Sequence, residues 1–190
     1  SRRQRQMCIR DSIRGAEYWS IAFMGKEKDK YFIRDLNSRS KDQEVENLII
    51  LVDNIDLQTM ENGPSLASSK KSERDQSVNF HKYWIDVASE IGCHSIRVNL
   101  RSDESDSNKI LENSSESILS LINHSRSQGI SVVVENHGGI TGDADWLVRL
   151  MKNINSKFIG TLPDFGSYNF CVKRGELNFE GITGDCEDQY

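Results

Sequence analysis

Two acidic side chains stand where two predicted strands end, and their type and position suit them to chemistry. Glu135 follows the β-branched run of residues 132–134 and lies just before a glycine pair. Asp164 follows Pro163, which cannot donate a hydrogen bond to a sheet and therefore ends the strand before it. Parallel α/β proteins bind ligands at the carboxyl ends of their strands. Both acids are therefore candidate site residues.

Carboxylates on neighbouring strand ends could supply two ligands to one divalent cation. Hard cations such as magnesium prefer carboxylate and water oxygens, and an imidazole broadens the choice to manganese, cobalt, iron or zinc. Glu135 and Asp164 would then be metal ligands, but a catalytic ion usually has three protein ligands or more. The alternative is that both acids accept hydrogen bonds from backbone N–H groups of the loops that follow them.

Three further polar residues are candidates for binding a substrate. His137 shares a face with Glu135 if side chains alternate along the strand. It would ligate a metal, donate to the substrate or simply pack beneath the glycines. Arg97 and Asn99 form a polar row on a strand whose other face is apolar. They could hold a substrate oxygen anion, because guanidinium offers a rigid fork of donors, or they could pair with Glu135 or with an acid of a loop.

The elements that must position these residues alternate between strand and helix. Apolar, β-prone runs predict strands at residues 16–23, 48–52, 94–100, 131–135 and 158–162. Amphipathic spacing predicts helices at residues 27–39, 80–91, 111–122 and 144–154, the last capped by Asp143 and the second ended by Gly92. The polar stretch 58–76 is expected to be a loop. The continuous valines of the fourth strand favour a parallel sheet covered on both faces.

This alternation predicts an α/β fold, because every crossover is long enough for a right-handed parallel connection. An open doubly wound sheet and part of a barrel both fit it. The open sheet should show a G-x-G-x-x-G turn after a strand, and the sequence has none. Acids on successive strand ends favour a barrel with its site at the mouth.

His81 and His124 fall on predicted helices, and we interpret both as surface or core residues away from the strand ends.

The composition and charge of the chain limit the kinds of partner that it can bind. The chain has 190 residues, 36% hydrophobic and 28% charged, and no apolar run long enough to span a bilayer. Setting residues 1–12 aside removes four arginines and one aspartate, which moves the formal net charge from −5 to −8. Phosphate backbones bind clustered Lys and Arg, so this acidic body argues against nucleic acid. The scattered Cys93, Cys171 and Cys186 indicate reduced thiols in a cytoplasmic protein.

The two ends of the chain need separate treatment. Residues 1–12 have no hydrophobic period and resemble the translation of a transposase sequencing adapter, so we expect them to lie outside the fold. Residues 167–190 show no closing strand or helix. We therefore expect residues 13–190 to be one incomplete domain, truncated at both ends.

Four segments resemble the sugar phosphate isomerase/epimerase family, the xylose isomerase-like TIM barrels. They are Gly15–Trp19, Gly92–Asn99, Val132–Gly139 and Gly160–Gly166, within a resemblance that spans about residues 13–185. The last two segments together are the most specific. One departure is that many relatives have D-F-G-N-F where this chain has Ser167 after D-F-G, so the contact of the family asparagine cannot be assigned here.

The resemblance implies a partial (β/α)8 TIM barrel in which the five predicted strands are strands two to six. Glu135 and Asp164 would end strands five and six as ligands of a divalent metal ion, either Mn, Mg, Co or Zn. A histidine and a second glutamate beyond Tyr190 would complete the site. The implied reaction is proton transfer next to a carbonyl of a small sugar, sugar phosphate or polyol, with Glu135 as one of two catalytic glutamates.

Two other functions are open on the same scaffold. An endonuclease IV-like repair barrel would need a basic groove and more histidine ligands, and the acidic body counts against it. A non-catalytic sugar-binding barrel would lack the histidine and glutamate of the later strands. Without barrel strands one, seven and eight the sheet would have unpaired edges, so we expect the chain alone to be unstable and to have little activity.

Overall fold

The computed structural model describes residues 13–164 except residues 24, 27 and 57, together with the backbone of β6 (Val172–Lys173) and β7 (Glu176–Leu177). The main strands are β1 (Gly15–Trp19), β2 (Glu46–Leu51), β3 (Ser95–Val98), β4 (Ser131–Glu135) and β5 (Ile159–Leu162). The helices are α2 (Lys30–Asp42), α3 (Lys71–Ile91), α4 (Ser107–Ser125) and α5 (Ala144–Ile154), with 3-10 turns η1 (Ser20–Phe23), η2 (Arg126–Gln128) and η3 (Gly139–Gly142). The expectations for residues 1–12, Ser167, Cys171 and Cys186 lie outside the described residues.

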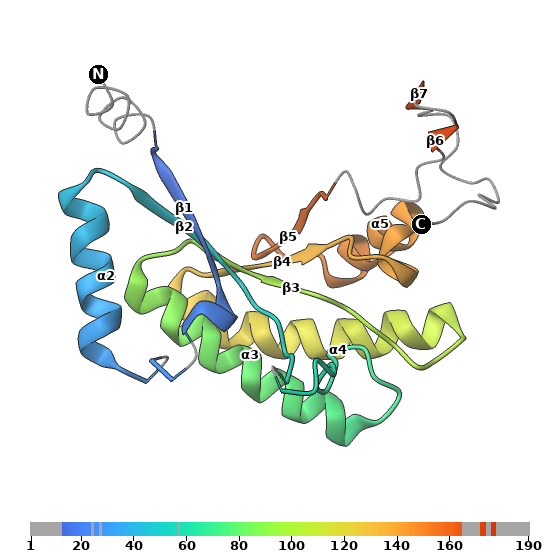
Figure 1. Cartoon of the computed structure of the whole chain (residues 1–190). Helices are drawn as coiled ribbons and strands as arrows, with labels where there is room; N and C mark the ends of the chain where they lie inside the picture. The colour runs from blue at the N-terminus through green and yellow to red at the C-terminus, as the bar shows by residue number, and fades with distance from the viewer. Residues whose placement is uncertain are drawn as a thin grey trace.

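Strands β1 to β5 form one parallel sheet in the order of the chain, which confirms the predicted α/β class. In Figure 1 the helices α3 and α4 lie together on one side of this sheet. Each of the four long helices packs on the strand that follows it and on its neighbouring helix. All the carboxyl ends of the strands therefore meet at one edge of the sheet.

The expected cover on both faces of the sheet is found along β3, where all four residues are buried, but not along β4. Val132 and Val134 are fully buried toward the helices, whereas Val133 and Glu135 on the other face are only half-buried. A sheet that curves toward a barrel has its inner face covered by other strands of the same barrel, not by helices. The half-buried face is therefore the inner face.

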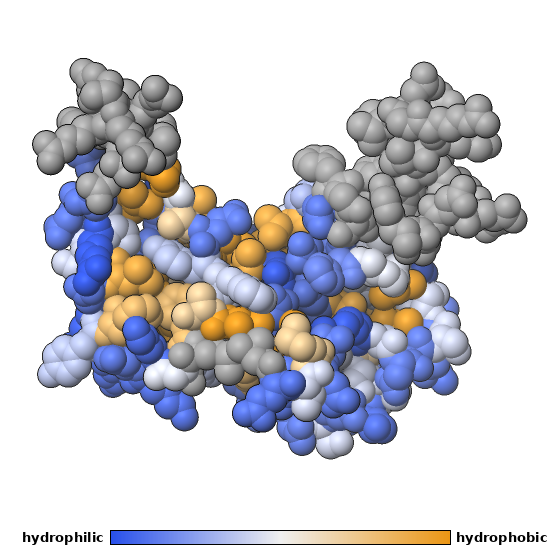
Figure 2. Space-filling view, viewed as in Figure 1, coloured by the Kyte–Doolittle hydropathy of each residue, from blue (hydrophilic) through white to orange (hydrophobic). Residues whose placement is uncertain are grey.

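The core lies between the sheet and its helices. Fully buried Ile50, Ile96 and Val98 from the strands meet Ile85 and Leu121 from α3 and α4. Burying one such side chain contributes about 1.5–3 kcal/mol, so this layer holds the strand ends in fixed relative positions. In the view of Figure 1, hydrophilic residues cover the lower, helical part of the surface (Figure 2).

Two helix ends follow the sequence signals. Gly92 ends α3 in the left-handed conformation with φ 89°, which an L-residue with a side chain adopts at a cost. Asp143 caps α5 by accepting hydrogen bonds from the N–H groups of Asp145 and Trp146. Its carboxylate occupies the helix start that follows the glycine turn, where the sequence alone would also allow an anion to bind.

Several predicted boundaries are wrong. Helix α3 begins at Lys71, although the loop was expected to reach residue 76, because the buried Arg74 anchors the polar first turn. Arg74 donates to the Ser68 carbonyl at 3.0 Å and to Glu116 of α4 at 2.8 Å. The first strand stops at Trp19, and the apolar residues after it form the turn η1. Helix α2 starts at Lys30 and runs past residue 39, with Asp29 as its cap.

Candidate functional site

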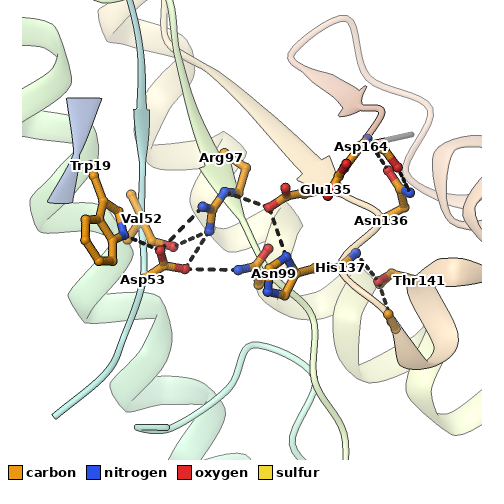
Figure 3. Close-up of polar contacts among 11 residues, drawn as sticks. Trp19, Val52, Asp53, Arg97, Asn99, Glu135, Asn136, His137, Thr141 and Asp164 are labelled. Atoms are coloured by element: carbon orange, nitrogen blue, oxygen red, sulfur yellow. Dashed lines mark hydrogen bonds and ion pairs between the residues drawn. The ribbon is translucent and has the colours of Figure 1, made fainter. Parts of the chain in front are cut away.

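The register of the parallel sheet brings two acids to either side of one arginine. Arg97 of β3 pairs with Leu51 of β2 and with Val133 of β4. Asp53 and Glu135 are each two residues beyond those partners, so both lie diagonally ahead of Arg97 on the same face. Figure 3 shows the Arg97 side chain between the two carboxylates.

Arg97 is buried and reaches both acids. Its Nη1 donates to Asp53 Oδ1 at 2.6 Å and to the Val52 carbonyl at 3.2 Å, and Nη2 donates to Asp53 Oδ2 at 3.4 Å. On the other edge, Nε lies 3.0 Å from Glu135 Oε2. Among the described residues neither of these two atoms has a hydrogen-bond partner, so this contact is an ion pair without hydrogen-bond geometry. The side chains are 7% exposed for Arg97 and 14% exposed for each acid.

Asp53 is held from several directions. Besides Arg97, its carboxylate accepts hydrogen bonds from Trp19 Nε1 at 2.5 Å and from Asn99 Nδ2 at 3.0 Å. Its backbone N–H donates to Ser20 Oγ at 3.0 Å. Burial raises the pKa of Asp53, but the hydrogen bonds and the charge of Arg97 outweigh burial, and the pKa lies below its ordinary value. Asp53 is therefore ionised at neutral pH.

Sequence reasoning missed Asp53 as a site residue. The signal was present, because Asp53 directly follows the buried run 48–52 just as Glu135 follows its valines. Trp19 is half exposed and donates to Asp53. The site extends from β1 to the end of β5.

His137 lies beside Glu135, as the alternation of side chains predicted. Its Nδ1 is 3.4 Å from Glu135 Oε2, and its side chain is 53% exposed. The backbone N–H of His137 donates to Thr141 Oγ1 at 2.9 Å, and that hydroxyl donates to the Gly138 carbonyl at 2.8 Å. The turn thus fixes the backbone while the imidazole stays accessible. Arg97 and His137 both contact Oε2 of Glu135, and neither contact involves Oε1.

Asp164 is placed by Asn136, which follows Glu135 directly in the chain. Asn136 is 1% exposed, its Nδ2 donates to the Asp164 carbonyl at 2.7 Å, and its Oδ1 accepts from the Asp164 N–H at 2.6 Å. The side-chain amide replaces a pair of sheet hydrogen bonds beyond the end of β5 (Figure 3). Because Glu135 pairs with Leu162, Asp164 lies two residues past the level of Glu135 on the neighbouring strand.

The carboxylates of Glu135 and Asp164 fit part of a cation site. Glu135 and Asp164 are carboxylates on adjacent strand ends, the ligand type that divalent cations bind. Oε2 of Glu135 is a buried oxygen without a hydrogen bond from any described residue. Within the described ranges no three His, Cys, Asp or Glu side chains cluster as a complete metal site would require. A third ligand would have to come from outside those ranges.

The expectation that His81 lies away from the strand ends is wrong. His81 is 4% exposed and lines a cavity of about 10 Å³ with Asp53, Asn99 and Arg101. Its Nδ1 donates to the Ser77 carbonyl at 2.7 Å, and burial lowers its pKa to about 4, so the ring is neutral at pH 7. His124 lies on the surface as expected and contacts Asp86 at 2.7 Å.

A larger cavity of about 300 Å³ opens on the β1 side of the site. Asp53 and Ser20 line it together with the aromatic residues Phe80, Tyr83 and Trp84. Neither Glu135 nor Asp164 is among its lining residues.

No helix in the described ranges is both long enough and apolar enough to cross a membrane.

Comparison with known proteins gives the fold its family. A family model described as xylose isomerase-like TIM barrel matches residues 14–180. None of the curated proteins is a significant match. The five-stranded parallel sheet is thus part of a TIM barrel, which confirms the predicted fold.

Three similar solved structures illustrate the range of this fold. A D-psicose 3-epimerase crystallised in the presence of D-fructose is 14% identical, with a TM-score of 0.71 over 84% of this chain and 56% of that chain. The IOLI protein with a binding zinc atom is 12% identical, with a TM-score of 0.65 over 92% of this chain and 60% of that chain. An AP endonuclease of family 2 from Brucella melitensis is 16% identical, with a TM-score of 0.54 over 77% of this chain and 56% of that chain. These identities show the fold alone, and the chain spans less than two thirds of each structure.

Proposed function

Because the chain belongs to the xylose isomerase-like TIM barrel family, we propose that the protein carrying it is a metal-dependent isomerase or epimerase of a sugar, sugar phosphate or polyol. The proposed reaction moves a proton at the carbon next to a carbonyl. The observation that carries this proposal is Glu135, held at a strand end by Arg97 with the accessible His137 beside it. The D-psicose 3-epimerase of the same fold supports the substrate class.

Each residue of the site has a proposed role. Glu135 accepts the proton from the substrate carbon, and a glutamate outside the described residues returns it on the other face. His137 donates a hydrogen bond to a substrate hydroxyl, because its ring is accessible while its backbone is fixed. Glu135 and Asp164 would hold a divalent cation, which when bound would polarise the carbonyl and acidify the neighbouring C–H.

The repair-nuclease alternative has less support. The AP endonuclease of family 2 shares the fold with this chain at 16% identity, which does not carry over an activity. Asp53, Glu135 and Asp164 bring negative charge to the strand ends, and Arg97 is paired with two of these acids. A DNA backbone binds clustered Lys and Arg side chains, whereas these strand ends carry mainly acids. We also propose a cytoplasmic location, which the unpaired thiol of Cys93 supports.

Proton exchange tests the proposal directly. The assay follows deuterium incorporation at C3 of D-fructose in D2O by NMR, using the protein with a complete barrel, here called the parent protein. Glu135→Gln keeps the shape of the side chain but removes the base, so the exchange rate should fall by about 100-fold or more. The matched control is Glu44→Gln, because the Glu44 side chain is 82% exposed and contacts only Arg14 at 3.4 Å. Retained exchange in Glu135→Gln would remove Glu135 from this role.

A further inference from the structure

Each nitrogen of the buried Arg97 guanidinium faces an oxygen atom of the protein. Its three nitrogens face Asp53, the Val52 carbonyl and Glu135, and its side chain is 7% exposed. A substrate oxygen would have to compete with these contacts for a side chain that is almost completely buried. Breaking the pairing of a buried charge is costly. The substrate-binding role that the sequence allowed for Arg97 therefore has little support.

The guanidinium is planar, so its two edges move together. One edge is tied to Asp53 by both terminal nitrogens, and the Nε edge lies 3.0 Å from Glu135 Oε2. A fixed position of Asp53 therefore fixes the position of Nε, and the ion pair at 3.0 Å keeps one oxygen of Glu135 beside it. A lysine ammonium at the same place would be a single point charge without this geometry.

Asp53 is itself restrained by neighbours on other strands. Both of its carboxylate oxygens accept hydrogen bonds from protein donors, namely Arg97 and Asn99 on Oδ1 and Trp19 and Arg97 on Oδ2. The resulting chain of contacts runs from the end of β1 through β2 and β3 to Glu135 on β4. It leaves Oε1 of Glu135 outside the contacts with Arg97 and His137.

We infer that Asp53 and Arg97 are a positioning pair, which holds the Glu135 carboxylate in the orientation needed for proton transfer and does not bind the substrate. This inference rests on the proposed role of Glu135 as the base. A misplacement of a reacting group by about 1 Å can cost about 100-fold in rate, so a positioning pair should act on kcat. A substrate-binding arginine would act mainly on KM.

Two substitutions in the parent protein separate these roles. Arg97→Lys keeps the charge and loses the fork, and Asp53→Asn keeps the shape and loses the charge that orients the fork. For D-fructose we expect kcat to fall by about 100-fold in Arg97→Lys and about 10-fold in Asp53→Asn, with KM within about threefold of the wild type. The matched control is Arg39→Lys, because Arg39 pairs with Asp35 at 2.7 Å on the exposed face of α2. It should leave both constants unchanged.

The possible outcomes decide the inference. A raised KM with unchanged kcat in Arg97→Lys would make Arg97 a substrate ligand, and unchanged constants in both variants would make the pair purely structural. Either result overturns the inference while the proposed function stands. If the wild type itself neither turns over D-fructose nor exchanges its C3 proton, the proposed function fails for this ketose. Crystal structures of wild type and Asp53→Asn then decide: a displaced Glu135 carboxylate supports positioning, and an unmoved one overturns it.

Discussion

Replacing Asn136 by alanine should loosen the end of β5 and with it Asp164. Asn136 is 1% exposed and makes two hydrogen bonds to the backbone of Asp164, at 2.6 and 2.7 Å. Alanine cannot make either bond. The perturbation therefore removes the link that places Asp164 beside the strand of Glu135.

The size of the effect follows from the two bonds. Each contributes about 1 kcal/mol net, so the loss amounts to about 2 kcal/mol before any relaxation around the shortened side chain. If that energy is lost locally, the Asp164 amide should exchange with solvent about 30-fold faster, since 1.4 kcal/mol corresponds to a factor of ten. The binding of a divalent cation should weaken as well, because one of its two proposed ligands is released.

Hydrogen exchange and urea unfolding measure the two parts of this prediction. Exchange in the peptide that contains residues 158–164 should accelerate, and the free energy of unfolding of the parent protein should fall by up to about 2 kcal/mol. Asn153→Ala is the matched control, because exposed Asn153 makes a single hydrogen bond to Ser115 Oγ at 2.8 Å. Equal exchange and equal stability in the two variants would refute the argument that Asn136 holds Asp164.

Three further predictions concern other parts of the site and core. The His81 pKa of about 4 in the folded state lies below its ordinary 6.5, so its contribution to stability is complete above pH 6.5 and is lost as the pH falls toward 4, by about 3 kcal/mol at most. Urea unfolding between pH 7 and 4 should show this loss in the wild type and in His124→Gln, but a smaller one in His81→Gln. Burial raises the Cys93 pKa to about 12, so iodoacetamide at pH 8 should label it only after unfolding, and rapid labelling of the Cys93 peptide in the native protein would contradict this. Thr141→Val removes the hydroxyl that fixes the backbone of His137, and it should raise KM for D-fructose several-fold while Glu135-dependent exchange continues.

Local signals in the sequence were sufficient for much of the fold. Gly92 and Asp143 end and begin their helices where their residue types predict, because capping depends on the residue and its immediate neighbours. The start of α3 could not be predicted in this way. Its first turn is polar and depends on Arg74 reaching Glu116, 42 residues away on α4.

The site shows the same division between local and distant information. The alternation along β4 was enough to place His137 beside Glu135. Whether Arg97 would bind a substrate, a loop acid or Glu135 depended on the register of three strands, which the sequence does not specify. The link from Asn136 to Asp164 joins residues 28 apart across a register that was equally unknown.

The claim that Glu135 and Asp164 act in one pocket is tested most directly by diffraction from crystals of the parent protein grown with manganese. An anomalous difference map should show one ion with carboxylate oxygens of both residues at about 2.0–2.3 Å. An ordered manganese ion held by other residues, with the carboxylates of Glu135 and Asp164 turned away from each other, would contradict the claim.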